Sequence, residues 1–251
     1  MGTNMNPIGV ILLGIVQGLA EFLPISSSGH LVIIQNFLPG FSQPGILLDV
    51  ILHFGTLFSV AFFFRRKLFS YFNARYLTLL VIGTLPAVII GLLFKGQIET
   101  LFQSVKVVGW ALLATGVLNL LTDKFKTKTD VITNRNALLT GIIQAVAIIP
   151  GVSRSGSTIF ASTAQGINKK EAAEFSFILS VPAVLGANVL EMASSRDVIT
   201  GSYPLYILGF LASFVAGYIA ISLVFKLISS KHFEYFAYYC FALGILTIIF
   251  T

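Results

Sequence analysis

Two segments of the chain place charged and hydroxyl side chains within apolar surroundings, and chemistry is expected there. The first runs from Pro24 to His30 and follows Glu21, and the second runs from Pro150 to Thr158 and contains Arg154. An ionisable side chain is costly at membrane depth, so this glutamate and this arginine are candidates for function. We predict that the two segments meet and bring Glu21 and Arg154 together.

A helix that begins after each proline would offer a site for an anion. Free backbone N–H groups and the positive end of the helix dipole favour anions there, and the guanidinium of Arg154 suits two-point binding of phosphate. Gln17 lies one helical turn before Glu21 and faces the same way. The hydroxyl side chains expected to contribute are Ser26, Ser27, Ser28, Ser153, Ser155 and Thr158. An enzyme acting on phosphates and a substrate-binding half-helix of a transporter would both show this pattern, which leaves both open.

The composition indicates that lipid surrounds most of the chain. Of the 251 residues, 56% are hydrophobic and only 10% are charged, with a mean hydropathy of +0.90, whereas about a quarter of an ordinary soluble domain is charged. Several apolar runs reach the roughly 18 to 20 residues that cross a bilayer. Backbone groups in lipid must bond internally, so these spans are expected to be helices. The single cysteine, Cys240, excludes a disulfide framework and a thiolate metal site.

The chain reads as two related halves of one membrane domain, residues 1–251. Gln17 and Gln144 are 127 positions apart, and so are the Ser-Gly pairs at 28–29 and 155–156. We predict an all-α polytopic membrane protein with an inverted-topology repeat, each half holding one re-entrant helix-loop-helix and three transmembrane helices. Repeat one is 8–122, repeat two is 137–251 and the hinge loop is 123–136. The broken segments are 8–34 and 137–163, and the full spans are 46–64, 77–94, 105–121, 172–193, 205–225 and 235–250.

The basic residues predict how this fold is oriented. If each broken segment leaves the membrane on the side from which it enters, the basic connections at 65–75, 123–136, 169–170 and 226–231 all lie on one side. Cytoplasmic loops carry an excess of Lys and Arg, so that side is predicted to be cytoplasmic. Topology therefore explains the net charge of +6. No basic stripe with interleaved aromatic residues indicates a nucleic-acid partner.

Both motifs also resemble those of a known family. The likeness rests on QGLAEFLPISSSGH at 17–30 and PGVSRSGST at 150–158, and it extends through 49–57 and 175–182 to essentially the whole chain. These stretches are similar to the signature motifs of the bacterial undecaprenyl pyrophosphate phosphatase family, also called bacitracin-resistance proteins. The resemblance implies an integral membrane phosphatase that converts the C55 polyprenyl diphosphate to the monophosphate carrier and inorganic phosphate during cell-wall synthesis. It also implies the bacterial cytoplasmic (inner) membrane, with the active site facing the periplasmic or extracellular side.

Four residues are expected to be catalytic in such a reaction. Arg154 would hold the diphosphate, and Ser27 would either attack phosphorus or position an attacking water. His30, three residues after Ser27, would act as general base or acid. Glu21 would orient His30 or bind a divalent cation, Mg²⁺ or Ca²⁺, that bridges the phosphates. A covalent phosphoserine and direct attack by water both stay open.

The remaining candidates would bind the substrate or support the catalytic group. Asp49 and His53 are four residues apart on one helical face, where an interhelical polar contact and a supporting role are equally expected. Position 17 is Glu in some members of the family and Gln here, so a two-carboxylate metal site at 17 and 21 is not assumed. The expected substrate-binding residues are Gln17, Ser26, Ser28, Ser153, Ser155 and Thr158.

Two other functions also fit the sequence, and the oligomeric state is open. The chief rival is a transporter or flippase of polyprenyl phosphate lipids, because opposed broken helices are a transporter device. A nonenzymatic receptor for lipid headgroups is a more distant alternative. The expected partners are a polyprenyl diphosphate lipid and membrane lipids, and a homodimer is left open.

Overall fold

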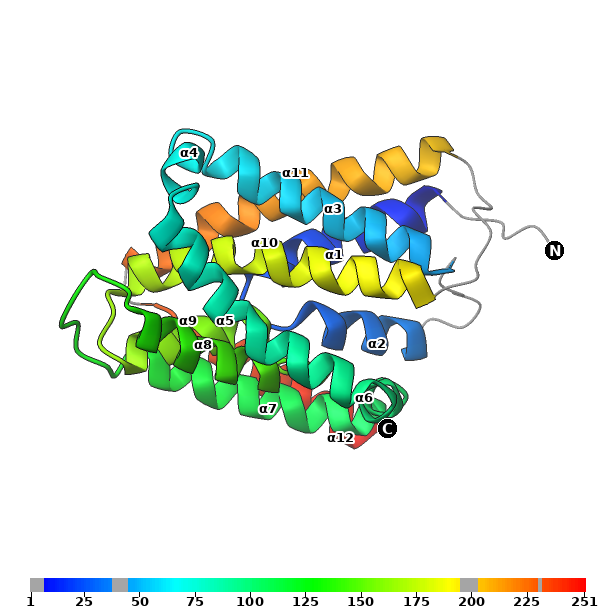
Figure 1. Cartoon of the computed structure of the whole chain (residues 1–251). Helices are drawn as coiled ribbons and strands as arrows, with labels where there is room; N and C mark the ends of the chain where they lie inside the picture. The colour runs from blue at the N-terminus through cyan, green and yellow to red at the C-terminus, as the bar shows by residue number, and fades with distance from the viewer. Residues whose placement is uncertain (1–6, 38–44, 195–202, 230–231) are drawn as a thin grey trace.

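The computed structural model describes residues 7–37, 45–194, 203–229 and 232–251, which form a bundle of helices (Figure 1). No β-strand occurs within these ranges, which confirms the all-α class. The helices are α1 (Pro7–Phe22), α2 (Ser27–Phe37), α3 (Gly45–Phe63), α4 (Leu68–Tyr71), α5 (Ala74–Leu93), α6 (Lys95–Phe102), α7 (Val105–Thr122), α8 (Asn134–Val146), α9 (Arg154–Ala164), α10 (Lys169–Ser194), α11 (Tyr203–Ser229) and α12 (Glu234–Phe250).

Four helices are long and apolar enough to cross a bilayer, namely α5, α7, α10 and α11. Helix α12 and the part of α3 from Leu47 to Phe63 are also apolar but shorter. The chain is therefore a multi-pass membrane protein, and all six predicted spans appear as apolar helices. Only 17% of the apolar window of α5 is buried, as expected for a helix that faces lipid. The short helices α4 and α6, in the connections on either side of α5, were not predicted.

The first predicted break lies between α1 and α2. Pro24 lacks a backbone N–H and cannot continue the helix, and Ser26 adopts a positive φ of 70°. The side chain of Ser26 then accepts a hydrogen bond from the N–H of Gly29 at 3.3 Å, which caps the start of α2. Helix α2 runs back toward the end of the molecule at which α1 begins (Figure 1). We call the turn at residues 23–26, with the first turn of α2, the first tip.

The second break lies between α8 and α9. Gly151 has a φ of +94°, and a Cβ there would lie 2.6 Å from the carbonyl oxygen of Val108, so only glycine fits. The start of α8 and the end of α9 lie side by side, because the Nδ2 of Asn136 donates to Oε1 of Gln165 at 3.0 Å. The segment is thus a hairpin that returns to its starting end. We call the turn at residues 147–153, with the first turn of α9, the second tip.

The two tips meet, and α7 holds both. A Cβ on Gly29 would lie 3.0 Å from the Cα of Gly151. From α7, the hydroxyl of Thr115 donates to the carbonyl of Gly151 at 2.9 Å, and the Nδ2 of Asn119 donates to the carbonyl of Pro24 at 2.6 Å. Both carbonyls have lost their helical partners at a break, so these bonds satisfy groups that would be costly in lipid.

Close backbone contacts fix the hairpins against two long helices. Helix α1 packs along α11, where a Cβ on Gly18 would lie 2.5 Å from the carbonyl oxygen of Ser213. Helix α8 packs along α5, where a Cβ on Gly141 would lie 2.4 Å from the carbonyl oxygen of Gly83. Small residues permit such approaches between membrane helices. The predicted repeat relates α1 to α8 and α11 to α5, so it would map one of these packed helix pairs onto the other. The duplication itself stays a prediction.

The predicted hinge loop ends three residues earlier than expected. Helix α8 begins at Asn134, and a capping box between Thr133 and Asn136 sets its first turn. The loop before it is tied to the end of the second hairpin, because the N–H groups of Lys128 and Thr129 both donate to the carbonyl of Gly166.

Candidate active site

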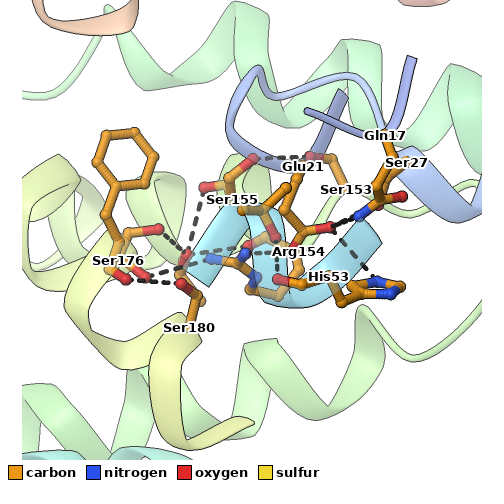
Figure 2. Close-up of polar contacts among 12 residues, drawn as sticks. Gln17, Glu21, Ser27, His53, Ser153, Arg154, Ser155, Ser176 and Ser180 are labelled. Carbon is orange, nitrogen blue, oxygen red and sulfur yellow. Dashed lines mark hydrogen bonds and ion pairs between the residues drawn. The ribbon is translucent and has the colours of Figure 1, made fainter. Parts of the chain in front are cut away.

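The site centres on the carboxylate of Glu21, at the end of α1, which is only 8% exposed. Its Oε1 accepts a hydrogen bond from Nη2 of Arg154 at 2.6 Å. Its Oε2 accepts from Oγ of Ser27 at 2.8 Å and from Nε2 of Gln17 at 3.1 Å (Figure 2). The structure therefore brings together four residues that were predicted as site residues, from both tips.

The guanidinium of Arg154 is oriented from two sides. Arg154 is the first residue of α9, so its own helix start lies beside its charge. Its Nη1 donates to the carbonyl of Ser176 on α10 at 3.2 Å, opposite the bond to Glu21. Thr158 strengthens this arrangement, since its hydroxyl bonds the hydroxyl of Ser176 at 2.6 Å and the carbonyl of Arg154 at 2.9 Å. Two anchors leave other N–H donors of the guanidinium for a ligand.

In the second tip the hydroxyls of Ser153, Ser155 and Thr158 are buried and already bonded to protein, whereas the buried Oγ of Ser157 has no hydrogen-bond partner among the described residues. The Oγ of Ser153 accepts from the N–H of Gly156 at 3.1 Å and lies 3.2 Å from Oγ of Ser155. Ser155 also donates to the carbonyl of Leu23 in the first tip at 3.2 Å. With Thr158, these residues build the second tip, and binding of substrate by their side chains would require these bonds to open. Their role as phosphate ligands stays a prediction.

At the first tip the hydroxyls are less enclosed. Ser27 and Ser28 are half-buried, whereas Ser26 is buried and caps α2. The hydroxyls of Ser26 and Ser28 lie 3.4 Å apart. Ser27 is thus the hydroxyl that both contacts the central carboxylate and retains exposed surface.

The contacts of His30 and His53 differ from those that the sequence predicted. The predicted pairing of His30 with Ser27 and Glu21 is not present among the described contacts: Nδ1 of His30 lies 2.7 Å from the carbonyl of Ser26, and Nε2 lies 2.7 Å from Oη of Tyr239 on α12. The two rings stack with centroids 5.6 Å apart. Helical spacing alone placed His30 near Ser27, but a partner on a distant helix turns its ring away.

His53, predicted only as a supporting residue, is the histidine beside the carboxylate. Its Nε2 lies 3.9 Å from Oε2 of Glu21, and its Nδ1 lies 2.9 Å from the backbone carbonyl of Asp49. The carboxylate of Asp49 does not make this contact, and its Oδ1 is buried without a hydrogen-bond partner in the described part of the chain. Asp49 therefore supports His53 through its backbone.

The bonds to carbonyl groups assign the protons on both rings. A carbonyl oxygen can only accept, so Nδ1 carries the hydrogen in His30 and in His53. In a neutral ring Nε2 is then the acceptor. The hydroxyl of Tyr239 occupies that acceptor in His30. In His53 it points toward Glu21, so His53 is able to receive a proton at the site.

The residues do not form a metal site of their own. Across residues 7–37, 45–194, 203–229 and 232–251, no three His, Cys, Asp or Glu side chains are grouped so as to hold an ion. Both oxygens of Glu21 already accept hydrogen bonds, and Gln17 presents an amide N–H, not a second carboxylate. A resident Mg²⁺ or Ca²⁺ would need more oxygen ligands than these residues supply.

Sequence reasoning missed four residues that shape this site. Ser176, Thr115, Asn119 and Tyr239 bond directly to predicted site residues or to the tips. Ser176 lies in the stretch 175–182, whose resemblance to the phosphatase family was a signal. The other three look like ordinary polar or aromatic residues of a span.

The amino-acid sequence is similar to proteins of a known family over almost its whole length. The family described as bacitracin resistance protein BacA matches residues 10–246. An undecaprenyl-diphosphatase of Halothermothrix orenii is 44% identical, covering 98% of both chains. Proteins of the same name from Syntrophotalea carbinolica and Christiangramia forsetii are each 39% identical, covering 96% and 98% of this chain and 97% and 98% of their own length.

Proposed function

The chain belongs to the bacitracin resistance protein BacA family, and we propose that it hydrolyses undecaprenyl diphosphate to undecaprenyl phosphate and inorganic phosphate. This reaction recycles the lipid carrier for cell-wall synthesis. One observation carries the proposal: an arginine, a carboxylate and a partly exposed serine hydroxyl from two opposed tips are hydrogen-bonded together within the membrane domain. The names of the relatives supply the substrate class.

Arg154 neutralises charge in this reaction. Phosphoryl transfer depends on positioning and on stabilising the negative charge of the transferred group. The guanidinium is held by Glu21 and by the carbonyl of Ser176, so it need not reorganise when the diphosphate arrives. Its remaining N–H donors bind phosphate oxygens.

Ser27 and Glu21 carry the bond-forming step. In the covalent version, Oγ of Ser27 bonds to the terminal phosphorus, its proton passes to Oε2 of Glu21, and the bridging P–O bond breaks to release undecaprenyl phosphate. Water then hydrolyses the phosphoserine. In the direct version, Ser27 positions a water that attacks the same phosphorus and gives its proton to Glu21. The 2.8 Å bond from Ser27 to Glu21 suits both versions, which phosphoenzyme trapping would distinguish.

We assign the handling of this proton to His53 in place of His30. The acceptor nitrogen of His53 faces Oε2 of Glu21, so the two groups can share the proton taken from the nucleophile. His30, bonded to Ser26 and Tyr239, positions the start of α2 and hence Ser27.

A divalent cation stays a proposed requirement. We propose that Mg²⁺ or Ca²⁺ arrives with the diphosphate, since Mg²⁺ is commonly bound by one or two carboxylates together with substrate phosphates. Such an ion would neutralise phosphate charge. Activity that survives complete chelation would remove the cation from the reaction.

We also propose the location and orientation that the sequence predicts. The protein would lie in the bacterial inner membrane with its site open to the periplasmic or extracellular side. The basic connections at 65–75 and 123–133 lie at the end of the bundle where α3 ends and α8 begins, which supports a cytoplasmic assignment for that end (Figure 1). Labelling a Ser28→Cys variant with a membrane-impermeant thiol reagent tests this, because the only native cysteine, Cys240, is buried.

The function is tested by phosphate release from undecaprenyl diphosphate by the purified, detergent-solubilised protein supplied with Mg²⁺ or Ca²⁺. We expect release by the native protein and by Arg135→Ala, which removes an exposed arginine, but not by Arg154→Ala. A native protein that releases no phosphate would contradict the proposal. The same assay separates an enzyme from the alternative of a carrier or flippase for polyprenyl phosphate lipids, which none of the comparisons supports.

A further inference from the structure

A basic pocket lined by residues other than those of the Glu21 site lies at one end of the bundle. It has a volume of about 540 Å³ and is found where α3 and α11 end and α10 begins (Figure 1). Four cationic side chains line it, and Glu174 is the one acidic side chain that does so. The cationic residues are Arg66, Lys67, Lys170 and Lys226.

The acidic residue of this pocket is already satisfied. Both oxygens of Glu174 accept from Nζ of Lys67, at 3.2 and 3.0 Å, and Oε1 also accepts from the hydroxyl of Tyr71 at 2.5 Å. Burial, followed by the hydrogen bond to Glu174, raises the pKa of Tyr71, so Tyr71 keeps its proton and remains a donor. Glu174 and Lys67 therefore offset each other, and Arg66 and Lys170 add further positive charge to the lining of the pocket.

The floor of the pocket is apolar. Phe63 and Phe225 both line it and stack with ring centroids 5.6 Å apart. Phe225 in turn contacts the buried Phe177 edge-on at 5.8 Å. The rings are thus part of the packed core, which makes the floor rigid.

An apolar track continues from the pocket along α11. Leu223 and Ile219 precede Lys226 by three and seven residues, so the three side chains share one helical face. Leu223 is 38% exposed and Ile219 is 53% exposed. Because α11 spans the membrane, this face leads from a cationic pocket at the bilayer surface into hydrocarbon. A soluble phosphate would use only the charged end of such a surface.

We propose that this pocket binds the headgroup of an anionic glycerophospholipid, with an acyl chain lying along Leu223 and Ile219. Basic pockets between membrane helices suit anionic headgroups, and each lysine or arginine contributes to the attraction. The site is separate from the Glu21 centre and does not depend on the phosphatase reaction.

Lipid retention tests the proposal without an activity readout. The purified protein is titrated with phosphatidylglycerol or phosphatidylcholine, and bound lipid is counted by native mass spectrometry. We expect phosphatidylglycerol to bind more tightly, and removal of each lysine to weaken its binding about fivefold, so that the Lys170→Ala/Lys226→Ala pair shows the larger loss. Lys170→Arg/Lys226→Arg should retain binding.

A matched pair gives the control. Lys124 and Lys126 are exposed in the loop after α7, at the same end of the bundle but outside the pocket. Lys124→Ala/Lys126→Ala should leave phosphatidylglycerol binding unchanged. Equal losses from both pairs, or no preference over phosphatidylcholine, would overturn the proposal. So would stronger displacement of the bound lipid by undecaprenyl phosphate or by inorganic phosphate than by phosphatidylglycerol.

Discussion

The two tips each lead into a short helix but differ in chemical role. Helices α2 and α9 have 11 residues each, and their first residues, Ser27 and Arg154, are 127 positions apart, which is the spacing of the predicted repeat. At the first tip this position carries a hydroxyl that retains exposed surface. At the second it carries a cation whose neighbouring hydroxyls are buried and bonded. One tip is thus suited to react and the other to hold charge, and the residues at the first position of each helix make this difference.

The largest effect is expected from the second tip. Arg154→Ala should lower phosphate release about 10³-fold or more, because a preorganised arginine stabilises the charge of phosphoryl transfer. It also removes the arginine that pairs with the buried Glu21, which should destabilise the fold by about 3–5 kcal/mol. Phosphate release and thermal unfolding measure the two effects. Glu21→Gln/Arg154→Gln should restore stability but not activity, and restored activity would refute the role of the arginine.

The first tip should affect chemistry without affecting stability. Ser27→Ala is expected to reduce turnover about 10²-fold or more, with little change in the unfolding temperature because Ser27 is half-buried. Ser155→Ala is the matched change in the second tip. It removes a buried bond to the first tip and should lower stability by about 1–3 kcal/mol with a smaller loss of turnover. Equal effects of the two substitutions on turnover would remove the proposed division between the tips.

Two histidines, His30 in the first tip and His53 on α3, sharpen the comparison. His53→Gln should lower turnover about 10²-fold and remove one ionisation from the pH–rate profile, since an amide cannot take up the proton. His30→Gln should lower turnover by less and retain that ionisation, because the ring contributes bonds to Ser26 and Tyr239 and no proton transfer. The measurement is the pH dependence of kcat. A profile altered only by His30→Gln would return the proton-handling role to His30.

The smallest effect is expected from the helix that joins the tips. Thr115→Val keeps the shape but removes the donor to the carbonyl of Gly151 and the acceptor for the N–H of Ser153. We expect a loss of about 1–3 kcal/mol in stability and a modest fall in kcat. Thr122→Val is the control on the same helix, since the bond that its hydroxyl makes among the described residues is to the carbonyl of Leu118 in its own helix. Equal losses from both would mean that Thr115 does not support the second tip specifically.

The sequence predicted the parts of the site that depend on local chemistry. Pro24 and the Pro150-Gly151 pair located both breaks, and the cost of charge in lipid predicted that Glu21 and Arg154 would meet. Both inferences rest on the need to satisfy backbone hydrogen bonds and on the cost of burying charge, which can be judged from the sequence alone. The spans were found for the same reason, since hydropathy and length decide them.

The rest depended on contacts between distant parts of the chain. His30 and Tyr239 are 209 positions apart, and no local pattern reveals that this tyrosine turns the imidazole away from Ser27. Thr115 and Asn119 have side chains that membrane helices commonly bond to their own backbone, so their bonds to the tips gave no signal. The amphipathic helix α6 was missed because its eight residues resemble a loop between two long apolar runs.

Because one helix bonds to both breaks, the two halves of the active centre cannot be displaced independently. Helix α7 also packs tightly on α12, where a Cβ on Gly116 would lie 2.6 Å from the ring of Phe241. Pressure at this seam would shift Thr115 and Asn119 together and so move nucleophile and cation as a unit. Inhibitors that wedge between α7 and α12 could thereby silence catalysis without ever approaching the phosphate.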